Sequence, residues 1–439
     1  MVTEMLLAVN CGSSSIKFKL YSLSNLDALI SGSASSVGVK GANPSIKYTV
    51  HEPGQDEDEK VSEEEQEGMP YEDVFERVIA LIEDSSSKHF VSKDDSKPKS
   101  RVRDLVKVVA HRVVHGGTES EPMVIWPGHE EGLQKMDALS IFAPLHNHFA
   151  VEVVRFCLKY IPAARQVLLF DTMFHSTIPP QVYTYPLAPS SETLPIPLRK
   201  YGAHGLSYAS VLDSVSSYLG KPKDQCSLVI AHLGSGASVC LVKDGKSYDT
   251  SMGLTPLDGL PGGTRTGSVD PVLIFHHTPD ASELVDIPGG QCAKAEIVMN
   301  KRGGLQALTG TSNFGEITLN ISRDDKARLA YNVFLDRLMN YIGSYVVKAY
   351  GAGGRLDGIV FSGGIGERSV ELRRDVGKMF EWMGCVVDHR ANEAVGKDKT
   401  VVTEISDSTS RLKLFVCQTD EEGQCAKTAK QFYESKHLS

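Results

Sequence analysis

The chain has 439 residues, of which 41% are hydrophobic and 23% charged, a composition typical of a globular protein with about two or three domains. No apolar run is long enough to span a bilayer, and residues 1–10 lack the basic and apolar regions of a signal peptide. The eight cysteines are scattered without a Cys-x-x-Cys pair, which favours reduced thiols over disulfides or a zinc site. We therefore expect a cytoplasmic protein with no membrane partner.

One segment accounts for nearly all of the formal net charge of −9. Residues 52–67 contain nine acidic residues and one lysine, a run typical of a solvated loop between ordered elements. A second polar stretch, residues 84–100, predicts another surface loop. The rest of the chain is close to neutral and has no basic stripe, which argues against a nucleic-acid partner.

The first predicted element is a β-hairpin with a polar tip. An apolar run over residues 6–9 predicts a buried strand, and alternation of apolar residues with lysines over 16–20 predicts a half-buried one. Gly12 marks the turn, and the donors of residues 13–15 with Lys17 suit a phosphate. A serine-rich turn is also typical of ordinary solvated loops, so this motif alone does not establish a phosphate site.

The strand–turn–strand pattern returns at residues 228–242, which indicates two related domains that each begin with the same hairpin. A third glycine-rich turn, residues 359–367, follows a short strand and opens a helix, an arrangement that suits an anion or a nucleotide. The chain lacks the lysine of a P-loop and the third glycine of a dinucleotide-binding fingerprint. Before this turn, a long amphipathic helix is predicted with one apolar face, made of Leu329, Val333, Leu338, Tyr341 and Tyr345.

Several short segments place polar side chains at predicted strand ends or in glycine-rich loops. A single polar side chain of this kind is typical of a solvated or core residue. Their recurrence beside glycine-rich turns that suit a nucleotide favours a functional site. The side chains are His111, Arg112 and His115, then His146, Asp171, His204, Arg265 and the acidic run 420–422. His111 and His115 have helical metal-site spacing, but the missing glutamate and the β-branched neighbours favour a strand.

These segments resemble the acetokinase family, along essentially the whole chain and in the family's order. The matching stretches are VNCGSSSIK, HRVVHGG, APLHN, LFDTMFH, YGAHG, HLGSG, SMGLTPLDGLPGGTRTG, SGGIGE and TDEE. The resemblance implies an α/β fold of two duplicated ribonuclease-H-like (actin-like ATPase) domains with an active-site cleft between them. Residues 1–171, with the acidic insertion 52–67, would form the N-terminal domain and be completed by 421–439. Residues 172–420 would form the C-terminal domain, which binds nucleotide and makes a homodimer.

The resemblance also implies the reaction. It is the reversible, direct in-line transfer of the γ-phosphoryl group from ATP to acetate, giving acetyl phosphate and ADP, with Mg²⁺ or Mn²⁺ as cofactor. Two alternatives remain open, a kinase for propionate or butyrate and an actin- or chaperone-like ATPase that binds a protein partner. The ATPase gives no reason for Arg112 and Arg265 to lie in kinase motifs.

Site residues carry over position by position. The residues implied in phosphoryl transfer are Arg112, His146, Asp171, His204 and Arg265. The metal-associated positions are Asn10 and Glu421. The positions that contact the nucleotide are Ser13, Ser15, Lys17, His232, Gly234, Ser235, Gly236, Asn313, Phe314, Gly315, Gly364, Ile365, Gly366, Glu367 and Arg368. The residues around the acetyl group are Arg112, Val114, Leu145, Ala203 and Pro256.

The chemistry of acetate, which accepts the phosphoryl group, supports the roles of the cationic site residues. Acetate has a pKa of roughly 4–5, so at neutral pH the carboxylate is already the nucleophile and no general base is needed. The reaction instead needs positioning and cations around a phosphoryl group moving between two anions. We therefore expect Asp171 to hold magnesium or Arg265 rather than to take a proton.

The chain departs from the family pattern at a few positions. Ala203 stands where the family usually has phenylalanine, which predicts a wider acyl pocket that admits propionate or a larger acid. On the phosphoryl-donor side, Gly364 and Ile365 leave room for adenine and favour ATP, but other changes leave pyrophosphate as an alternative donor. Those changes are Ser235 and Arg368 for asparagine, Asn313 for aspartate and Gly315 for arginine.

Overall fold

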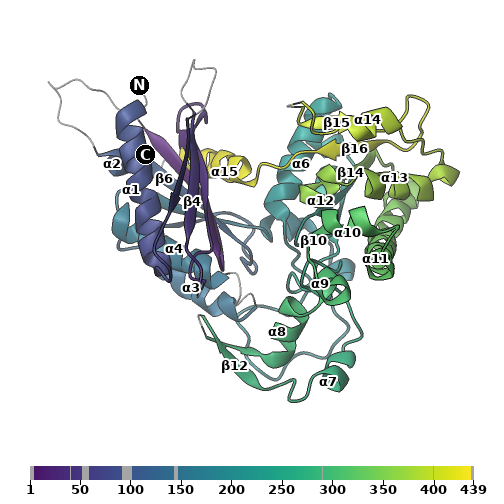
Figure 1. The fold of residues 1–439 in the computed structure, drawn as a ribbon, viewed down its shortest axis with the longest axis horizontal. Helices are drawn as coiled ribbons and strands as arrows, with labels where there is room; N and C mark the ends of the chain where they lie inside the picture. The colour runs from purple at the N-terminus through teal and green to yellow at the C-terminus, as the bar shows by residue number, and fades with distance from the viewer. Residues whose placement is uncertain are drawn as a thin grey trace. The chain divides into compact units, whose positions relative to one another are not determined.

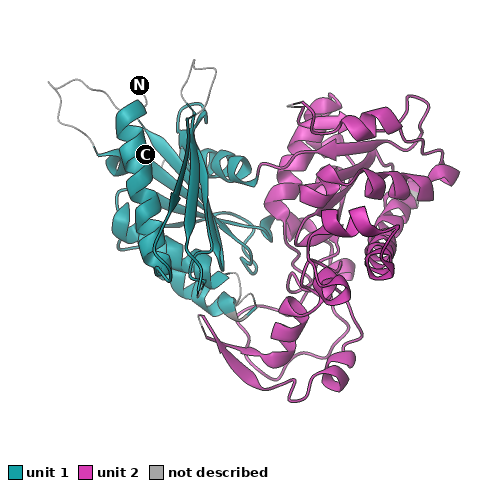
Figure 2. Cartoon of the chain, in the orientation of Figure 1, with its two compact units in different colours: residues 1–173, 421–439 teal, residues 174–420 magenta. Residues whose placement is uncertain are grey.

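The protein is described here by a computed structural model that covers residues 4–39, 41–51, 59–90, 101–142, 147–288, 290–398 and 400–436. The chain forms two compact units, coloured separately in Figure 2. Unit 1 comprises Met1–Met173 and Glu421–Ser439, and unit 2 comprises Phe174–Asp420. In the described ranges, no helix combines the length and the apolar character needed to cross a membrane.

Unit 1 is built on an eight-stranded sheet with the order β5-β4-β3-β2-β1-β6-β8-β7. The central strands β1, β6 and β8 are parallel, and β2 to β5 and β7 are antiparallel to their neighbours. The strands are β1 (Met5–Gly12), β2 (Ser15–Ser22), β3 (Ala28–Ser35), β4 (Ser45–Val50), β5 (Glu59–Glu64), β6 (Val106–Val113), β7 (Met123–Ile125) and β8 (Arg165–Phe170).

Helices cover both faces of this sheet (Figure 1). One face packs on α1 and α4, where Phe75 and Val153 meet Leu7 and Val9 of β1. The other face of β1 and β6 packs on α15. The helices are α1 (Tyr71–His89), α2 (Val102–Leu105), α3 (Glu131–Leu139), η1 (Ser140–Phe142), α4 (Asn147–Tyr160) and α15 (Glu421–Ser435), and η2 (Met173–Thr177) begins at the boundary between the units.

Unit 2 repeats the same design around a six-stranded sheet with the order β11-β10-β9-β14-β16-β15. Here β9, β14 and β16 are parallel, whereas β10, β11 and β15 are antiparallel to their neighbours, so β11-β10-β9-β14-β16 matches β3-β2-β1-β6-β8 of unit 1. The strands are β9 (Leu228–Leu233), β10 (Ala237–Lys243), β11 (Lys246–Thr250), β14 (Gly358–Ser362), β15 (Val402–Glu404) and β16 (Leu414–Cys417), and a separate ribbon has β12 (Leu284–Ile287) and β13 (Gly290–Ala293). The predicted pair of duplicated α/β domains is therefore confirmed, whereas a nucleotide cleft between them stays a prediction.

The unit 2 sheet also lies between helices (Figure 1). Phe334 and Leu338 of α11 pack on one face, and Tyr208 and Val211 of α6 pack on the other. The helices are α5 (Pro180–Tyr183), α6 (Gly205–Tyr218), η3 (Lys223–Gln225), α7 (Leu273–His277), α8 (Lys294–Lys301), α9 (Gly304–Thr309), α10 (Phe314–Asn320), α11 (Asp325–Tyr350), η4 (Gly351–Gly353), α12 (Gly363–Arg368), α13 (Val370–Met379), η5 (Glu381–Met383) and α14 (His389–Ala394).

The apolar face predicted for α11 is partly wrong. Leu338 and Tyr345 are buried as expected, but Leu329 is 56% exposed. The buried stripe runs instead through Ala330 and Phe334, because positions four apart along a helix share a face.

The two predicted surface loops are also partly wrong. Within the acidic stretch 52–67, residues 59–64 form β5, which pairs with β4 at the edge of the sheet. An edge strand can carry charged side chains because it is held by backbone hydrogen bonds to one neighbouring strand. In addition, Arg77 of α1 forms ion pairs with the Glu63 and Glu65 carboxylates. In the stretch 84–100, α1 continues to His89, and the buried Ser85 hydroxyl donates to the Tyr48 hydroxyl of β4 at 3.3 Å. Residues 52–58 and 91–100 lie outside the described residues.

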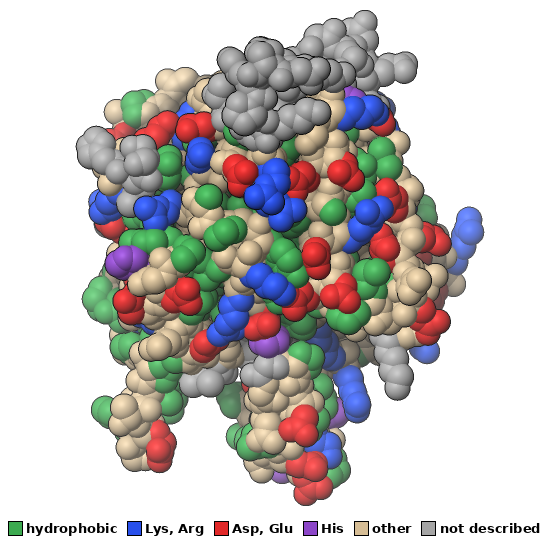
Figure 3. All heavy atoms as spheres, turned by 90° about the vertical axis from the view of Figure 1, so that its left-hand side faces the viewer, with side chains coloured by type: hydrophobic (Ala, Val, Ile, Leu, Met, Phe, Trp, Pro, Cys, Tyr) green, Lys and Arg blue, Asp and Glu red, His purple; other side chains and the backbone are tan. Residues whose placement is uncertain are grey.

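Charge on the surface is mixed where it is visible. On the face drawn in Figure 3, lysine and arginine side chains are interspersed with aspartate and glutamate. Such a mixed surface is ordinary for a globular protein.

Candidate active site

In unit 1, two predicted site residues meet at the carboxyl ends of neighbouring parallel strands. Arg112 lies in β6 opposite Leu169 of β8, and Asp171 directly follows β8. The Arg112 guanidinium donates from Nε to Asp171 Oδ1 at 3.1 Å and from Nη2 to Oδ2 at 2.8 Å. Asp171 is only 1% exposed, so this is a buried bidentate ion pair.

Residues from the two ends of the chain complete this cluster. Glu421 is the first residue of α15, and its Oε2 accepts from Arg112 Nη1 at 2.5 Å. Asn10 pairs with Arg112 across β1 and β6, and its Nδ2 lies 3.3 Å from Glu421 Oε2 and 3.5 Å from Glu422 Oε1. The sheet register thus brings together four predicted residues that are far apart in sequence.

The electrostatics of the cluster keep Arg112 charged. Burial lowers the pKa of the guanidinium, but the carboxylates of Asp171 and Glu421 outweigh burial and raise this pKa above its ordinary value. The expectation that Asp171 holds magnesium or Arg265 stays a prediction; within unit 1, both Asp171 oxygens accept from Arg112.

The same cluster has a donor set that suits a divalent cation. Asn10, Glu421 and Glu422 carry amide and carboxylate oxygens, and Mg²⁺ prefers oxygen ligands. Across the described ranges, no group of three or more His, Cys, Asp or Glu side chains is arranged to hold a metal ion. The residues therefore fit a cation that uses one or two carboxylates and takes its other ligands from substrate phosphates and water.

The predicted hairpin lies beside this cluster. β1 and β2 pair from Met5 to Gly12, and Gly12 opposes Ser15, so Ser13 and Ser14 form an exposed two-residue tip. Lys17 pairs with Asn10 across the two strands and is exposed. The Tyr71 hydroxyl donates to the Gly12 carbonyl at 3.1 Å and steadies the turn.

In unit 2, His204 occupies an unusual backbone conformation at the start of α6. Its φ of +59° is in the left-handed region, which a residue with a side chain rarely adopts. The His204 ring lies 4.5 Å from that of His232, centroid to centroid, and His204 Nδ1 lies 2.8 Å from Ser238 Oγ. Ser238 also contacts the Tyr208 hydroxyl.

The second hairpin tip, residues 234–236, brings Arg265 to the same place. A Cβ atom built on Gly236 would lie 3.3 Å from Arg265 Nη1 and 3.5 Å from His204 Nε2, so both side chains approach this glycine closely. The Gly263 amide donates to the Ser235 carbonyl at 2.8 Å and ties the Arg265 loop to the tip. Burial lowers the pKa of Arg265 from its ordinary value.

The remaining predicted nucleotide contacts lie at two helix starts in unit 2. Asn313 caps α10, and its Oδ1 accepts from the Gly315 amide at 3.0 Å, whereas Phe314 packs in the core. The strand–glycine–helix prediction is confirmed by β14 and α12, where Glu367 Oε1 accepts from the Gly363 amide at 3.0 Å. Gly364, Ile365, Gly366, Glu367 and Arg368 all lie in α12.

The predicted acyl pocket is not brought together by either unit alone. Val114 lies in unit 1, Ala203 and Pro256 lie in unit 2, and Leu145 falls outside the described residues, as does His146. Their grouping around an acetyl group stays a prediction.

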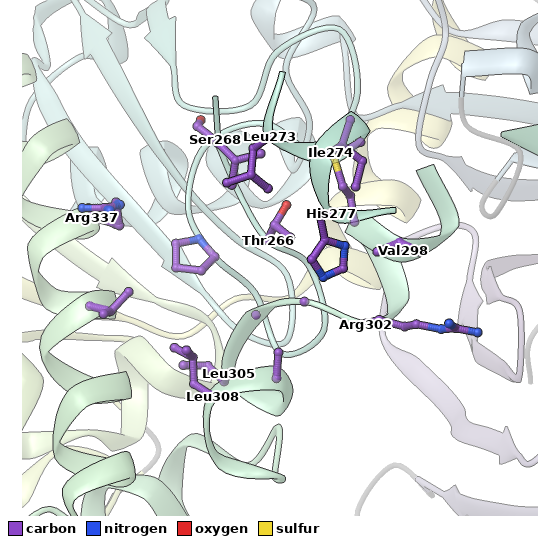
Figure 4. A pocket seen from close by; sticks show the side chains of 17 residues that line it. Thr266, Ser268, Leu273, Ile274, His277, Val298, Arg302, Leu305, Leu308 and Arg337 are labelled. Atoms are coloured by element: carbon purple, nitrogen blue, oxygen red, sulfur yellow. The ribbon is translucent and has the colours of Figure 1, made fainter. Parts of the chain in front are cut away.

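Unit 2 also has a cavity of about 330 Å³ behind the Arg265 loop (Figure 4). Its walls include Thr266, Leu273 and Leu305, and Arg302 and Arg337 lie on opposite sides. None of the predicted site residues lines this cavity, so it is separate from the candidate site.

Sequence reasoning missed the residues that support His204. Ser238 Oγ contacts His204 Nδ1, and the Tyr208 hydroxyl contacts Ser238. His175 Nε2 contacts the carbonyl oxygen of Ala203, the residue before His204. His175 lies in the matching stretch LFDTMFH, which was the one available signal for it.

Comparisons with known proteins agree with the motifs. A model of the acetokinase family matches residues 5–427. A probable acetate kinase from Cryptococcus neoformans var. neoformans serotype D (strain B-3501A) is 47% identical over 438 residues, which cover 98% of each chain. The solved structure of a propionate kinase from Francisella tularensis subsp. tularensis SCHU S4 has a TM-score of 0.79 at 31% identity, over 98% of this chain and 99% of that one. The acetate kinase structure from Porphyromonas gingivalis has a TM-score of 0.76 at 31% identity, with the same coverage.

Proposed function

Because the chain belongs to the acetokinase family, we propose that it transfers the γ-phosphoryl group of ATP to acetate, giving acetyl phosphate and ADP. The observation that carries the proposal is the buried, charged guanidinium of Arg112, held by Asp171 and Glu421 at the carboxyl ends of parallel strands. The reaction is reversible and is a single in-line transfer.

Arg112 is the residue that binds the acceptor. A guanidinium has five N–H donors, and Asp171 and Glu421 take three of those of Arg112 in the described part of unit 1. One N–H on each Nη is left, which suits the two oxygens of a carboxylate. The acetate oxygen would then be held in place for attack on phosphorus.

No proton has to be removed from this acceptor. A carboxylic acid is ionised at neutral pH, so it has no proton to lose. Both oxygens of Asp171 accept hydrogen bonds from the Arg112 guanidinium. Asp171 therefore acts by fixing the orientation of Arg112.

The unit 2 residues neutralise charge on the transferring group. Arg265 and His204 both approach the hairpin tip at Gly236, so each can donate to phosphoryl oxygens there. When bound by the oxygens of Asn10 and Glu421, Mg²⁺ or Mn²⁺ would neutralise the charge of the ATP phosphates. The serine hydroxyls and Lys17 of the first hairpin supply further donors beside that cluster.

Propionate is a second candidate acceptor. Ala203 is small and buried where the family usually has an aromatic ring, and one added methylene in such a pocket changes binding by about 1–3 kcal/mol. The similarity to a propionate kinase structure is in keeping with this candidate.

A cytoplasmic homodimer that pairs through unit 2 is part of the proposal. Seven of the eight cysteines are buried and all are free thiols, which suits a reducing compartment. Val272 and Phe275, near α7 of unit 2, are 56% and 66% exposed, and large exposed apolar side chains favour a protein interface.

Trapping of the product with hydroxylamine tests the proposed reaction. The full chain is incubated with ATP, Mg²⁺ and acetate, propionate or butyrate in parallel, and the acyl hydroxamate is measured. We expect hydroxamate that depends on both ATP and the acid, with acetate or propionate preferred. Acid-independent ATP hydrolysis without hydroxamate would favour the actin- or chaperone-like ATPase instead.

A further inference from the structure

A second histidine lies directly behind the turn that carries His204. His175 in η2 is 2% exposed, and its Nε2 lies 2.9 Å from the Ala203 carbonyl oxygen. Its Nδ1 lies 2.7 Å from the hydroxyl of Ser247 in β11. All of these residues belong to unit 2.

The partners of His175 define where its proton is. A carbonyl oxygen only accepts, so Nε2 carries the hydrogen and donates to Ala203, and Nδ1 accepts from the Ser247 hydroxyl. Burial lowers the pKa of His175 to about 4, so the ring stays neutral near pH 7 and this pattern persists.

The turn held by His175 has a strained backbone. His204 has φ +59° and Gly202 has φ +78°. A Cβ atom on Gly202 would lie 2.6 Å from His175 Cδ2, so only glycine allows the ring so close. A residue with a side chain is strained in the left-handed region, and that conformation persists only where neighbouring contacts hold it.

Two further contacts secure the other end of this turn. The Gly202 amide donates to the Gly253 carbonyl at 3.0 Å. Lys200 Nζ pairs with Asp249 at 2.8 Å, and Asp249 lies in the same strand as Ser247. The fold therefore does not depend on His175 alone to keep the segment in place, and the bond to Ala203 acts on the peptide nearest His204.

We propose that His175 is a positioning residue for phosphoryl transfer: its Nε2–H bond to the Ala203 carbonyl holds His204 in the left-handed turn that directs the His204 ring to Gly236 and Arg265. Ser247 fixes the tautomer that makes this bond. The inference rests on the proposed function, because it gives His204 a role in that reaction. A displacement of about 1 Å in a positioned group can lower activity by about 100-fold, so we expect loss of this hydrogen bond to lower activity by about 10- to 100-fold.

The test compares variants that differ in the Nε2 donor. His175→Gln keeps an N–H near the Nε2 position, whereas His175→Leu removes it. Ser247→Ala removes the hydroxyl that fixes the tautomer and serves if His175→Leu does not fold. Thr177→Val is the matched control, because Thr177 donates from the same η2 to the Ser247 carbonyl at 2.8 Å without touching Ala203.

Steady-state acyl phosphate formation gives the first readout. We expect His175→Leu to lower kcat about 10- to 100-fold with the KM values for acetate and ATP within about 3-fold. We expect His175→Gln to recover most of the loss, Ser247→Ala to lower kcat less than His175→Leu, and Thr177→Val to behave as wild type. Equal losses in His175→Gln, His175→Leu and Thr177→Val, or no loss in His175→Leu and Ser247→Ala, would overturn the inference.

The second readout does not use the reaction. The rate at which diethylpyrocarbonate modifies His204, followed by peptide mass spectrometry without substrate, reports on the turn itself. His175→Leu should raise this rate and His175→Gln should not, and an unchanged rate in His175→Leu would contradict the positioning role. If the wild-type chain forms no acyl phosphate, the proposed function fails, and this readout alone decides whether His175 holds the turn.

Discussion

Asp171 and Arg112 are joined by two parallel hydrogen bonds of 3.1 and 2.8 Å, at the ends of adjacent parallel strands. Both carboxylate oxygens are engaged by a guanidinium that stays charged, because Asp171 and Glu421 raise its pKa. We therefore propose that Asp171 orients this arginine, whereas a site that deprotonates a hydroxyl would need Asp171 as a base.

The first prediction concerns Asp171→Asn. In asparagine, an NH₂ group replaces one of the two carboxylate oxygens. This donor would face a guanidinium N–H, which is also a donor, so the bidentate pair is lost. We expect kcat to fall on the order of 10²- to 10³-fold. The kcat–pH profile of the variant should keep the shape of the wild-type profile. An acidic limb, in which kcat falls as the pH drops through the pKa of a carboxylate, that is present in the wild type and absent in the variant would show that Asp171 takes a proton. Asp137→Asn, in an exposed ion pair with Arg155, is the matched control and should be neutral.

The second prediction concerns Gly236→Ala at the second hairpin tip. The new Cβ would lie 3.3 Å from Arg265 Nη1, which is closer than ordinary van der Waals contact, so the guanidinium must shift. We expect kcat to fall about 10-fold, since small misplacements of positioned groups are costly, with little change in the melting temperature. Gly343→Ala is the control because nothing lies within 4 Å of its Cβ, and alanine is favoured in the helix α11. Equal kinetics for the two variants would argue against a role for this tip.

The third prediction concerns Ala203→Phe. A phenyl ring at this position should narrow the acyl pocket and lower kcat/KM for propionate relative to acetate by about 10- to 100-fold. The measurement is the ratio of the two kcat/KM values, with the melting temperature recorded to exclude misfolding. Ala203→Ser has nearly the same size as the wild type and should leave the ratio unchanged. An unchanged ratio in a folded Ala203→Phe variant would remove residue 203 from the acyl pocket.

The fourth prediction concerns stability at low pH. Burial lowers the pKa of His111 and His175 to about 4, whereas unfolded histidine titrates near 6.5. Between these values the unfolded chain binds more protons than the folded chain, so stability is lost as the pH falls from about 6.5 to 4. Each histidine should contribute a slope of about 1.4 kcal/mol per pH unit in this window.

Urea unfolding at pH 7, 6 and 5 measures this slope. Each unit has one of these histidines, so His111→Gln and His175→Gln should each flatten the pH dependence of the unit that holds the substitution. A free energy of unfolding that does not change between pH 7 and 5 would contradict the assignment of both rings as buried and neutral.

Much of the architecture was predictable because it depends on local patterns. The glycine-tipped hairpins of β1–β2 and β9–β10 follow from apolar runs around a turn, and the duplication follows from the repeat of that pattern. Strand β5 was not predicted, because its acidic residues indicated a solvated loop. An edge strand needs only backbone hydrogen bonds to one neighbouring strand, here β4.

The residues of the candidate site were named from motifs, whereas the contacts between them could not be predicted. Asn10, Arg112, Asp171 and Glu421 each stood out by motif, yet their contacts depend on the register of β1, β6 and β8 and on the return of α15. Such long-range register is not encoded in any short segment. The support of His204 by His175 was missed for the same reason.

In the proposed reaction, the acid's own carboxylate oxygen attacks the γ-phosphorus of ATP. Acetate labelled with ¹⁸O at both oxygens, with ATP and Mg²⁺, tests it most directly when the acetyl phosphate formed is examined by ³¹P NMR. We predict a phosphorus resonance with the upfield isotope shift of a directly bonded ¹⁸O, because the bridging oxygen comes from acetate. Acetyl phosphate whose phosphorus carries no ¹⁸O would mean that a phosphate oxygen attacked the carbonyl carbon, and would contradict direct transfer to the acid.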